Sequence, residues 1–325
     1  MMNNYADMLS LGKLSAPEFS YLLSSAAELR TNRSSSALDG KNIALIFEKP
    51  SLRTRVTFEV AIRQLGAWPI LLGTGESQLG ERESIPDLAR NLSLWVDGIV
   101  ARVYRHENLE ELASFATIPV INALSDWEHP CQALADVLTL SEVWAGDFHN
   151  KCVAYVGDWN NVSRSLWKAC ELSGIGFRAI GPKGYGPLPG ENVNWFSDPD
   201  AVEGADAIYT DVWASMGQES ETKQRSEIFH PYQVNERLFS KTGKPSFFMH
   251  CLPAHRGLEV TDPVIDSDNS LVFRQAANRL PAEKAILISL LENHDEAASE
   301  ESRARVLGRF GKLDYHPLAQ RKLWV

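Results

Sequence analysis

The fold of this chain is decided by the stretch Phe47-Glu-Lys-Pro-Ser51-Leu-Arg-Thr-Arg-Val-Thr-Phe-Glu59. It follows an apolar run at residues 43–46 that is typical of a buried strand. It leads into apolar residues that recur at helical spacing, namely Phe58, Ala61, Ile62 and Leu65. Pro50 disfavours helix before itself and Ser51 is a natural N-cap, so residues 51–55 are predicted at a strand-to-helix turn.

This turn has the chemistry of an anion site. The first turn of a helix has free backbone N–H groups and the positive end of the helix dipole. Two hydroxyls, of Ser51 and Thr54, and two guanidinium groups, of Arg53 and Arg55, stand on the same turn. A phosphate dianion would find all of these donors in one place. On the residues alone, a solvated arginine pair on a surface helix is an equal alternative.

Composition describes a globular protein and excludes several classes. At 325 residues the chain favours two domains over a single core. It has 44% apolar and 23% charged residues and no apolar run long enough for a membrane span, and its N-terminus lacks a signal peptide pattern. The net charge of −10 argues against a nucleic-acid partner. Four dispersed cysteines without a CxxC pair predict free thiols, no zinc site and a cytoplasmic location.

Apolar runs and helical patterns alternate along the chain. Strands are predicted at residues 43–47, 69–72, 98–103 and 118–121, with helices at 54–65, 85–95 and 109–115 between them. After a long helix at 129–144, further strands are predicted at 152–156, 177–180, 207–210, 247–249 and 271–273, with helices such as 163–172 between them and a late helix at 276–293. This order predicts an α/β fold of two Rossmann-like doubly wound domains with parallel sheets, joined by long interdomain helices. The predicted boundaries are 1–140, 141–290 and a C-terminal helix and tail at 291–325 that returns to the first domain.

Four further motifs follow the first stretch. They are His129-Pro-Cys-Gln132-Ala-Leu-Ala-Asp136, Asp158-Trp-Asn-Asn161, Asp211-Val-Trp-Ala-Ser215-Met216-Gly217 and His250-Cys251-Leu252-Pro253-Ala-His-Arg256-Gly257. In this order and at these separations, the five motifs resemble the aspartate/ornithine carbamoyltransferase family, and within it the ornithine carbamoyltransferases. The resemblance runs from about residue 43 to residue 290.

The resemblance implies transfer of the carbamoyl group of carbamoyl phosphate to the δ-amino group of L-ornithine, which yields L-citrulline and phosphate for arginine biosynthesis. It implies no metal and no organic cofactor; the expectations of no nucleic-acid partner and no membrane rest on composition. The residues after the strand at 152–156 also argue against a dinucleotide cofactor, because Gly157-Asp-Trp-Asn-Asn161 lacks the GxGxxG pattern of such a site.

The resemblance assigns carbamoyl phosphate to residues from several separate segments. They are Ser51, Leu52, Arg53, Thr54, Arg55, Gln78, Arg102, His129, Pro130, Cys131, Gln132, Cys251, Leu252 and Arg279. Arg102 and His129 are catalytic in this assignment, since a guanidinium and an imidazole can both donate to the carbamoyl oxygen as it gains negative charge.

Ornithine is assigned to Asn161, Asp211, Ser215 and Met216 by the same resemblance. From the sequence alone Cys251 is a nucleophile, a polar contact or an inert buried thiol. The resemblance implies a contact near the carbamoyl centre, where Cys251 and Asp211 help the δ-ammonium group of ornithine to lose its proton. An amine is nucleophilic only when neutral, so this deprotonation belongs to catalysis.

The Gly-rich loop at residues 73–80 carries Gln78. The resemblance implies that this loop reaches the neighbouring subunit's site in a homo-oligomer, expected to be a trimer. Aspartate carbamoyltransferases carry a lysine in this loop, so its absence favours ornithine as the acceptor.

Three positions depart from the family pattern. Leu52 replaces a threonine, Ala277 a glutamate and Pro281 a histidine. Pro281 is expected in the first turn of a helix that starts at residues 278–280. These departures leave open a catalytically weak paralogue that binds small anions, or binds a partner through the tail at 296–325. A second alternative is the same transfer to another amine, such as putrescine, an N-acylated ornithine or aspartate.

Overall fold

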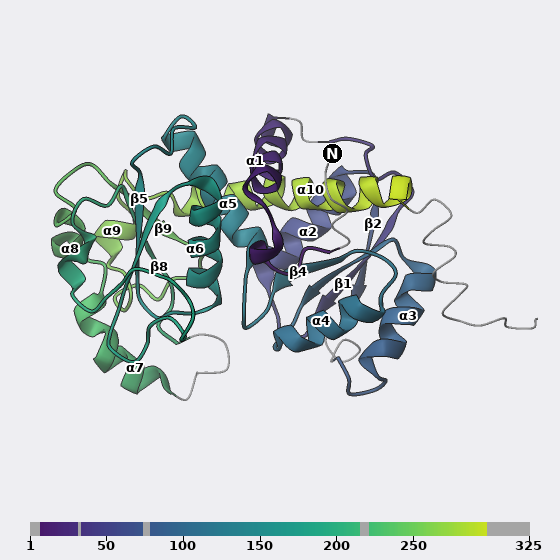
Figure 1. Cartoon of the computed structure of the whole chain (residues 1–325), viewed down its shortest axis with the longest axis horizontal. Helices are drawn as coiled ribbons and strands as arrows, with labels where there is room; N and C mark the ends of the chain where they lie inside the picture. Colours follow the sequence, from purple (N-terminus) through teal and green to yellow (C-terminus); the bar gives the residue numbers. More distant parts are fainter. Residues whose placement is uncertain (1–6, 32–33, 74–78, 215–220, 298–325) are drawn as a thin grey trace, which may run out of the picture.

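The computed structural model describes residues 7–31, 34–73, 79–214 and 221–297. Two α/β halves lie side by side, and each is built on a parallel sheet with helices against both faces (Figure 1). The predicted α/β class, with two parallel sheets in separate halves, is confirmed.

The first half holds a four-stranded sheet in the order β2-β1-β3-β4. Its elements are η1 (Leu11–Lys13), α1 (Ala16–Thr31), β1 (Asn42–Phe47), α2 (Leu52–Gln64), β2 (Trp68–Leu72), α3 (Ile85–Trp95), β3 (Gly98–Arg102), α4 (His106–Phe115) and β4 (Val120–Leu124).

The second half holds a five-stranded sheet in the order β7-β6-β5-β8-β9. Its elements are β5 (Cys152–Val156), α6 (Asn161–Ser173), β6 (Gly176–Ile180), β7 (Trp195–Phe196), η2 (Pro199–Val202), β8 (Ala207–Thr210), α7 (Thr222–Phe229), η4 (His230–Tyr232), α8 (Glu236–Ser240), β9 (Phe247–His250) and α9 (Asp262–Ile265).

Two long helices connect the halves. The first, α5 (Pro130–Val143), lies between them (Figure 1), and its residues from Pro130 to Leu140 are all buried. The second, α10 (Val272–Ala297), leaves the second half and packs against α1, α2 and α5. None of the helices in the described ranges combines the length and the apolar character needed to cross a membrane.

The central strands β1 and β5 are largely apolar because both of their faces are covered. In β1, Ile43 and Leu45 face the core shared with α2 and α5, while Ala44 and Ile46 face the core beneath α3 and α4. The side chains of β5 alternate in the same way between the α6 side and the opposite face. All the paired strands run parallel, so the polar residues that follow their carboxyl ends lie at one edge of each sheet.

The strand predicted at 271–273 is wrong. The chain makes one parallel bridge there, between Phe248 and Ser270, and then enters α10 at Val272. Short apolar runs do not distinguish a strand from a buried helix start, and Phe273, which is 70% exposed, fits a helix better than a core strand. The strand predicted at 118–121 begins later, at Val120, and β7 was not predicted.

The predicted helix start at residues 278–280 is also wrong. Because α10 begins at Val272, Pro281 lies well inside the helix instead of in its first turn. Proline has no N–H to donate to the carbonyl of Ala277. Ala277 is exposed, so water can reach that carbonyl instead.

Candidate active site

A cleft of about 880 Å³ lies between the two halves. Its walls come from the segments that follow β1, β3 and β4 in the first half and β5, β8 and β9 in the second. The carboxyl ends of parallel strands are where open α/β sheets bind ligands. The five motifs of the sequence therefore meet because each follows the end of a strand or opens a helix beside it.

The start of α2 forms one wall of the cleft. Ser51 is the N-cap in an extended conformation, and its hydroxyl makes no capping bond to the helix. The backbone N–H groups of the first turn are thus available to an anion. The Leu52 side chain is 76% exposed, so this position contributes its backbone N–H and no hydroxyl.

Arg55 turns away from the cleft. Its Nε donates to Glu59 Oε1 at 2.8 Å, one turn along α2, and Arg55 is absent from the lining residues. Pro130 and Cys131 are buried in the first turn of α5 and also do not line the cleft. Cys131 Sγ donates to the carbonyl of Asn122 at 3.4 Å, which occupies this thiol inside the fold.

Three arginines converge on the same wall: Arg53 from α2, Arg102 from the end of β3 and Arg279 from α10. The pairing of β3 with β4 shifts register between Ala101 and Arg102, and such bulges redirect side chains next to functional sites. Burial, followed by the charges of Arg279 and Arg53, lowers the pKa of Arg102 to about 10. Mutual repulsion of buried cations marks a site that would gain by taking up an anion.

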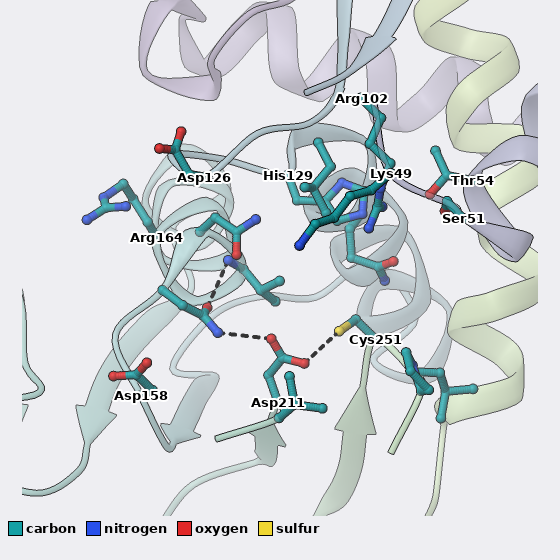
Figure 2. Close-up of a pocket in the computed structure, with 18 of the residues that line it drawn as sticks. Lys49, Ser51, Thr54, Arg102, Asp126, His129, Asp158, Arg164, Asp211 and Cys251 are labelled. Atoms are coloured by element: carbon teal, nitrogen blue, oxygen red, sulfur yellow. Dashed lines mark hydrogen bonds between the residues drawn. The ribbon is translucent and has the colours of Figure 1, made fainter. Parts of the chain in front are cut away.

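His129 is the N-cap of α5 and is buried beside these arginines (Figure 2). Burial, and then the charges of Arg279, Arg102 and Arg53, lower the pKa of His129 well below its ordinary value. Its imidazole is therefore neutral at pH 7 and carries one N–H donor. Its Nδ1 is buried and has no hydrogen-bond partner among the described residues.

Gln132 links the arginine wall to the interior of α5. Its Oε1 accepts from Arg279 Nη1 at 2.8 Å, and its Nε2 donates to Asp136 Oδ1 at 2.8 Å. Thr54 is tied to the same guanidinium, because Arg279 Nη2 donates to Thr54 Oγ1 at 3.2 Å. Arg279 thus joins α2, α5 and α10 at the back of the cleft.

The opposite wall is acidic and comes from the second half. Asp211 Oδ1 accepts from Cys251 Sγ at 3.1 Å, and Asp211 Oδ2 accepts from Asn160 Nδ2 at 3.0 Å (Figure 2). Burial, and then the carboxylate of Asp211, raise the pKa of the Cys251 thiol well above its ordinary value. A protonated thiol is a hydrogen-bond donor and a poor nucleophile.

Asn161 also lines the cleft, beside the N-cap residue of its helix. Its Nδ2 donates to the carbonyl of Ser125 across the cleft at 2.7 Å. Within the part of the chain that the structure describes, no group donates to its side-chain oxygen, which can accept from a ligand. Leu252 lines the cleft next to Cys251. Gln78, Ser215 and Met216 lie outside the described residues.

Several lining residues had not been predicted. Lys49 adds a cation near the arginines (Figure 2), and its Nζ lies 4.7 Å from the centre of the Tyr104 ring. Lys49 lies two residues before Ser51, within the stretch Phe47–Glu59, so its position beside the anion-site turn could have been inferred from the sequence. Arg164 follows Asn160 and Asn161 by four and three residues, which places it on their face of α6.

Arg164 also holds the two halves together. Its guanidinium carbon lies 3.8 Å from the centre of the Trp127 ring, and Nη1 donates to the Trp127 carbonyl at 3.1 Å. Its Nε donates to Glu191 Oε1 at 2.5 Å. Trp127 precedes α5 and Arg164 lies on α6, so this contact joins the two halves beside the cleft that both residues line.

Asp211, His250 and Cys251 place three possible metal-ligand atoms within 4.8 Å of one another. Each side chain already has protein partners. His250 Nδ1 accepts from the backbone N–H of Leu252 at 2.9 Å, and His250 Nε2 lies 3.3 Å from Glu259 Oε1. Protein contacts explain the arrangement without an ion.

Comparison with known proteins covers both halves. The family model described as "Aspartate/ornithine carbamoyltransferase, carbamoyl-P binding domain" matches residues 6–142, and its "Asp/Orn binding domain" matches residues 149–290. The chain belongs to the aspartate/ornithine carbamoyltransferase family. The arginine wall thus lies largely in the half that matches the carbamoyl-P domain, and Asp211 and Cys251 lie in the half that matches the Asp/Orn domain.

Individual members of the family are similar over most of the chain. A protein of Anoxybacillus flavithermus named ornithine carbamoyltransferase is 47% identical over 303 residues, which is 88% of this chain and 96% of the relative. One of Pyrococcus furiosus named "Ornithine carbamoyltransferase, anabolic" is 52% identical over 265 residues, or 77% of this chain and 84% of the relative. The crystal structure of ornithine carbamoyltransferase from Thermus thermophilus superposes with a TM-score of 0.82 at 45% identity, covering 89% of this chain and 100% of that one.

Proposed function

We propose that this protein transfers the carbamoyl group of carbamoyl phosphate to the δ-amino group of L-ornithine. The products are L-citrulline and phosphate. The observation that carries the proposal is the opposition of two walls in one cleft: three arginines and a helix N-terminus on one side, and Asp211 with Cys251 on the other. The names of the relatives support this reaction, and the anabolic name of the Pyrococcus furiosus relative supports a place in arginine biosynthesis.

Carbamoyl phosphate binds the arginine wall in this proposal. Its phosphate sits on the first turn of α2, against the N–H groups of Leu52, Arg53 and Thr54 and the hydroxyl of Ser51. Arg102 and the neutral His129 donate to the carbamoyl oxygen, and Gln132 orients the carbamoyl NH2. The oxygen gains negative charge as the carbon becomes tetrahedral, and one well-placed donor typically lowers such a barrier by about 3–4 kcal/mol.

Ornithine binds the acidic wall. Asn161 and Asp211, with Ser215 and Met216, hold its amino-acid group and guide its side chain toward Cys251. The δ-ammonium group first gives a proton to the Asp211 carboxylate at this end of the cleft. The neutral nitrogen attacks the carbamoyl carbon and loses a second proton, the bond from that carbon to the phosphate oxygen breaks, and the leaving phosphate takes up that second proton. Cys251 acts as a contact and forms no bond to the substrate.

The working assembly is proposed to be a homo-oligomer, expected to be a trimer, with the Gln78 loop of one subunit completing the site of its neighbour. Exposed apolar side chains on edge strand β2 and on α2, such as Trp68, Ile70 and Val56, support self-association of this half. We also propose domain boundaries at 1–140, 141–290 and 291–325. A cytoplasmic location fits the four free cysteines.

The test is citrulline formation from carbamoyl phosphate and L-ornithine, with putrescine, N-acetylornithine and aspartate as rival acceptors. Turnover with ornithine at a rate well above the three rivals is expected. Preferred turnover with a rival would retain the carbamoyl phosphate wall and overturn the assignment of the acidic wall. No turnover with any acceptor would overturn the proposed reaction.

A further inference from the structure

The arginine wall has a buried carboxylate behind it. Glu283 lies one helical turn after Arg279 in α10, and both side chains are buried, with 0% and 3% exposed. Glu283 Oε1 accepts from Arg279 Nη2 at 2.7 Å and from Arg279 Nε at 3.1 Å. Glu283 itself does not line the cleft, whereas Arg279 does.

This pair orients the guanidinium group. With Nε and one Nη2 hydrogen directed at Glu283, the remaining donors of Arg279 face the other way, toward Thr54 Oγ1 and Gln132 Oε1. Both acceptors belong to residues that line the cleft. A planar guanidinium that is anchored on one edge presents its other edge in a defined direction.

The pair also sets the charge of the wall. The groups that face Glu283 are Arg279 on its own helix, the Thr57 hydroxyl of α2 at 3.0 Å from Oε1, and the thiol of Cys131 on α5, whose pKa burial raises. Glu283 Oε2 is buried and has no hydrogen-bond partner among the described residues. An ionised Glu283 cancels one of the three arginine charges, and a protonated Glu283 restores it.

We propose that Glu283 is a positioning residue for Arg279, and that its gain or loss of a proton sets how strongly the arginine wall attracts the phosphate of the substrate. The inference rests on the proposed function, because it takes the arginine wall to be the phosphate site. It adds a pH-dependent control of carbamoyl phosphate and phosphate affinity that acts from outside the cleft.

The direction of the pH dependence follows from the surroundings of Glu283. Burial raises its pKa to about 7, although Arg279 and Thr57 act in the opposite sense. A bound phosphate dianion adds negative charge on the far side of Arg279, so it raises that pKa further. Binding therefore takes up a proton near pH 7–8, and affinity for the anion strengthens as pH falls through this range.

The experiment uses the whole enzyme and two variants that separate charge from reach. Glu283→Gln has the same length and keeps an oxygen that can accept from Arg279, but it removes the negative charge. Glu283→Asp keeps the charge, but its side chain is one methylene shorter, so the carboxylate lies farther from Arg279. Binding of inorganic phosphate is measured by calorimetry from pH 6 to pH 9 in two buffers of different ionisation enthalpy. The protonation of phosphate itself is common to all three proteins and cancels in the comparison. The kcat for citrulline formation is measured on the same samples.

At pH 8.5 the Glu283→Gln variant is expected to bind phosphate roughly tenfold more tightly than the native protein, and at pH 6 the two should agree within about twofold. The native protein should take up more protons on binding than Glu283→Gln near pH 7.5. Glu283→Asp should keep the pH dependence but lose about tenfold or more in kcat, which Glu283→Gln should retain.

A constant affinity ratio between the native protein and Glu283→Gln across this pH range would overturn the inference. A kcat that falls equally in both variants would do so too, because a purely structural role predicts equal damage. These outcomes are distinct from failure of the proposed function, which native enzyme without citrulline formation would show. If the native enzyme forms no citrulline, the phosphate titration still tests the inference. If Glu283→Gln fails to fold, the comparison is made between Glu283→Asp and the native protein.

Discussion

The substitution Asp211→Asn tests the acidic wall most directly. Asp211 is buried and accepts hydrogen bonds on both oxygens, from Cys251 and from Asn160. Asparagine has the same shape, and one orientation of its amide still accepts from Asn160 while its NH2 faces the weakly accepting sulfur. The change therefore removes a negative charge and preserves most of the packing.

The magnitude follows from the loss of that charge opposite an ammonium group. Two unit charges about 4 Å apart interact by about 4 kcal/mol at an effective dielectric constant near 20, and by about 1 kcal/mol in bulk water. The cleft is open to solvent but Asp211 is largely buried, so we expect a loss of about 2–4 kcal/mol in ornithine binding. Since about 1.4 kcal/mol corresponds to tenfold, the KM for ornithine should rise about 30- to 700-fold.

The assay is steady-state citrulline formation with each substrate varied in turn. The KM for carbamoyl phosphate should change by less than about threefold, because Asp211 faces the other wall. Asp126→Asn is the matched control, since Asp126 also lines the cleft but is exposed and accepts from the backbone N–H of His106. Removing its solvent-screened charge should alter the KM for ornithine by less than about threefold.

Two results would refute this reasoning. Equal increases in both KM values would mean that Asp211 supports the cleft as a whole and does not act on ornithine. An Asp126→Asn variant as impaired as Asp211→Asn would mean that the total charge of the cleft matters, and not the position of one buried carboxylate.

Three other perturbations have definite expected outcomes. Arg53→Ala should abolish the rise in melting temperature that carbamoyl phosphate produces, whereas Asp211→Asn should retain that rise and lose only the further rise on adding ornithine; loss of both rises in both variants would contradict the division of the cleft. Alkylation of Cys251 by iodoacetamide at pH 8, followed by mass spectrometry, should be slow in the native protein and faster in Asp211→Asn. Burial, and then the Asp211 carboxylate, hold the pKa of this thiol up. An unchanged alkylation rate would show that Asp211 does not control the protonation of Cys251. Burial raises the pKa of Asp136 from 3.8 to about 6, despite hydrogen bonds from Gln275 and Gln132. Between about pH 4 and pH 6, Asp136 therefore keeps its proton in the folded state, whereas the unfolded chain has released it. Ionisation of the buried carboxyl lowers the free energy of unfolding, and this loss reaches its full size only above pH 6. Urea unfolding should show Asp136→Asn gaining up to roughly 3 kcal/mol relative to the native protein between pH 4 and pH 8, and a gain that is the same at both pH values would refute the assignment.

Local sequence was enough to predict most of the elements and the order of the site motifs, with β7 and the start of α10 as exceptions. The turn at residues 51–55, the strand at 152–156 and the helix at 85–95 appear where local spacing predicted them, because an apolar face and a cap are encoded by neighbours in the chain. Placing polar residues such as Asp211 and Cys251 after strands was also enough to bring them together, since parallel strands end at one edge.

Which side chains face the cleft, and which partners they have there, depends on the packing of the whole molecule. Arg55 and Cys131 stand in the right motifs but turn toward Glu59 and Asn122, and nothing in their spacing reveals that. The pairs Arg279–Thr54 and Arg164–Trp127 depend on how α10 and α6 pack against the first half. Short-range spacing encodes which residues share an element, whereas burial, charge and pKa depend on groups that are distant in the chain and meet only when the halves pack together.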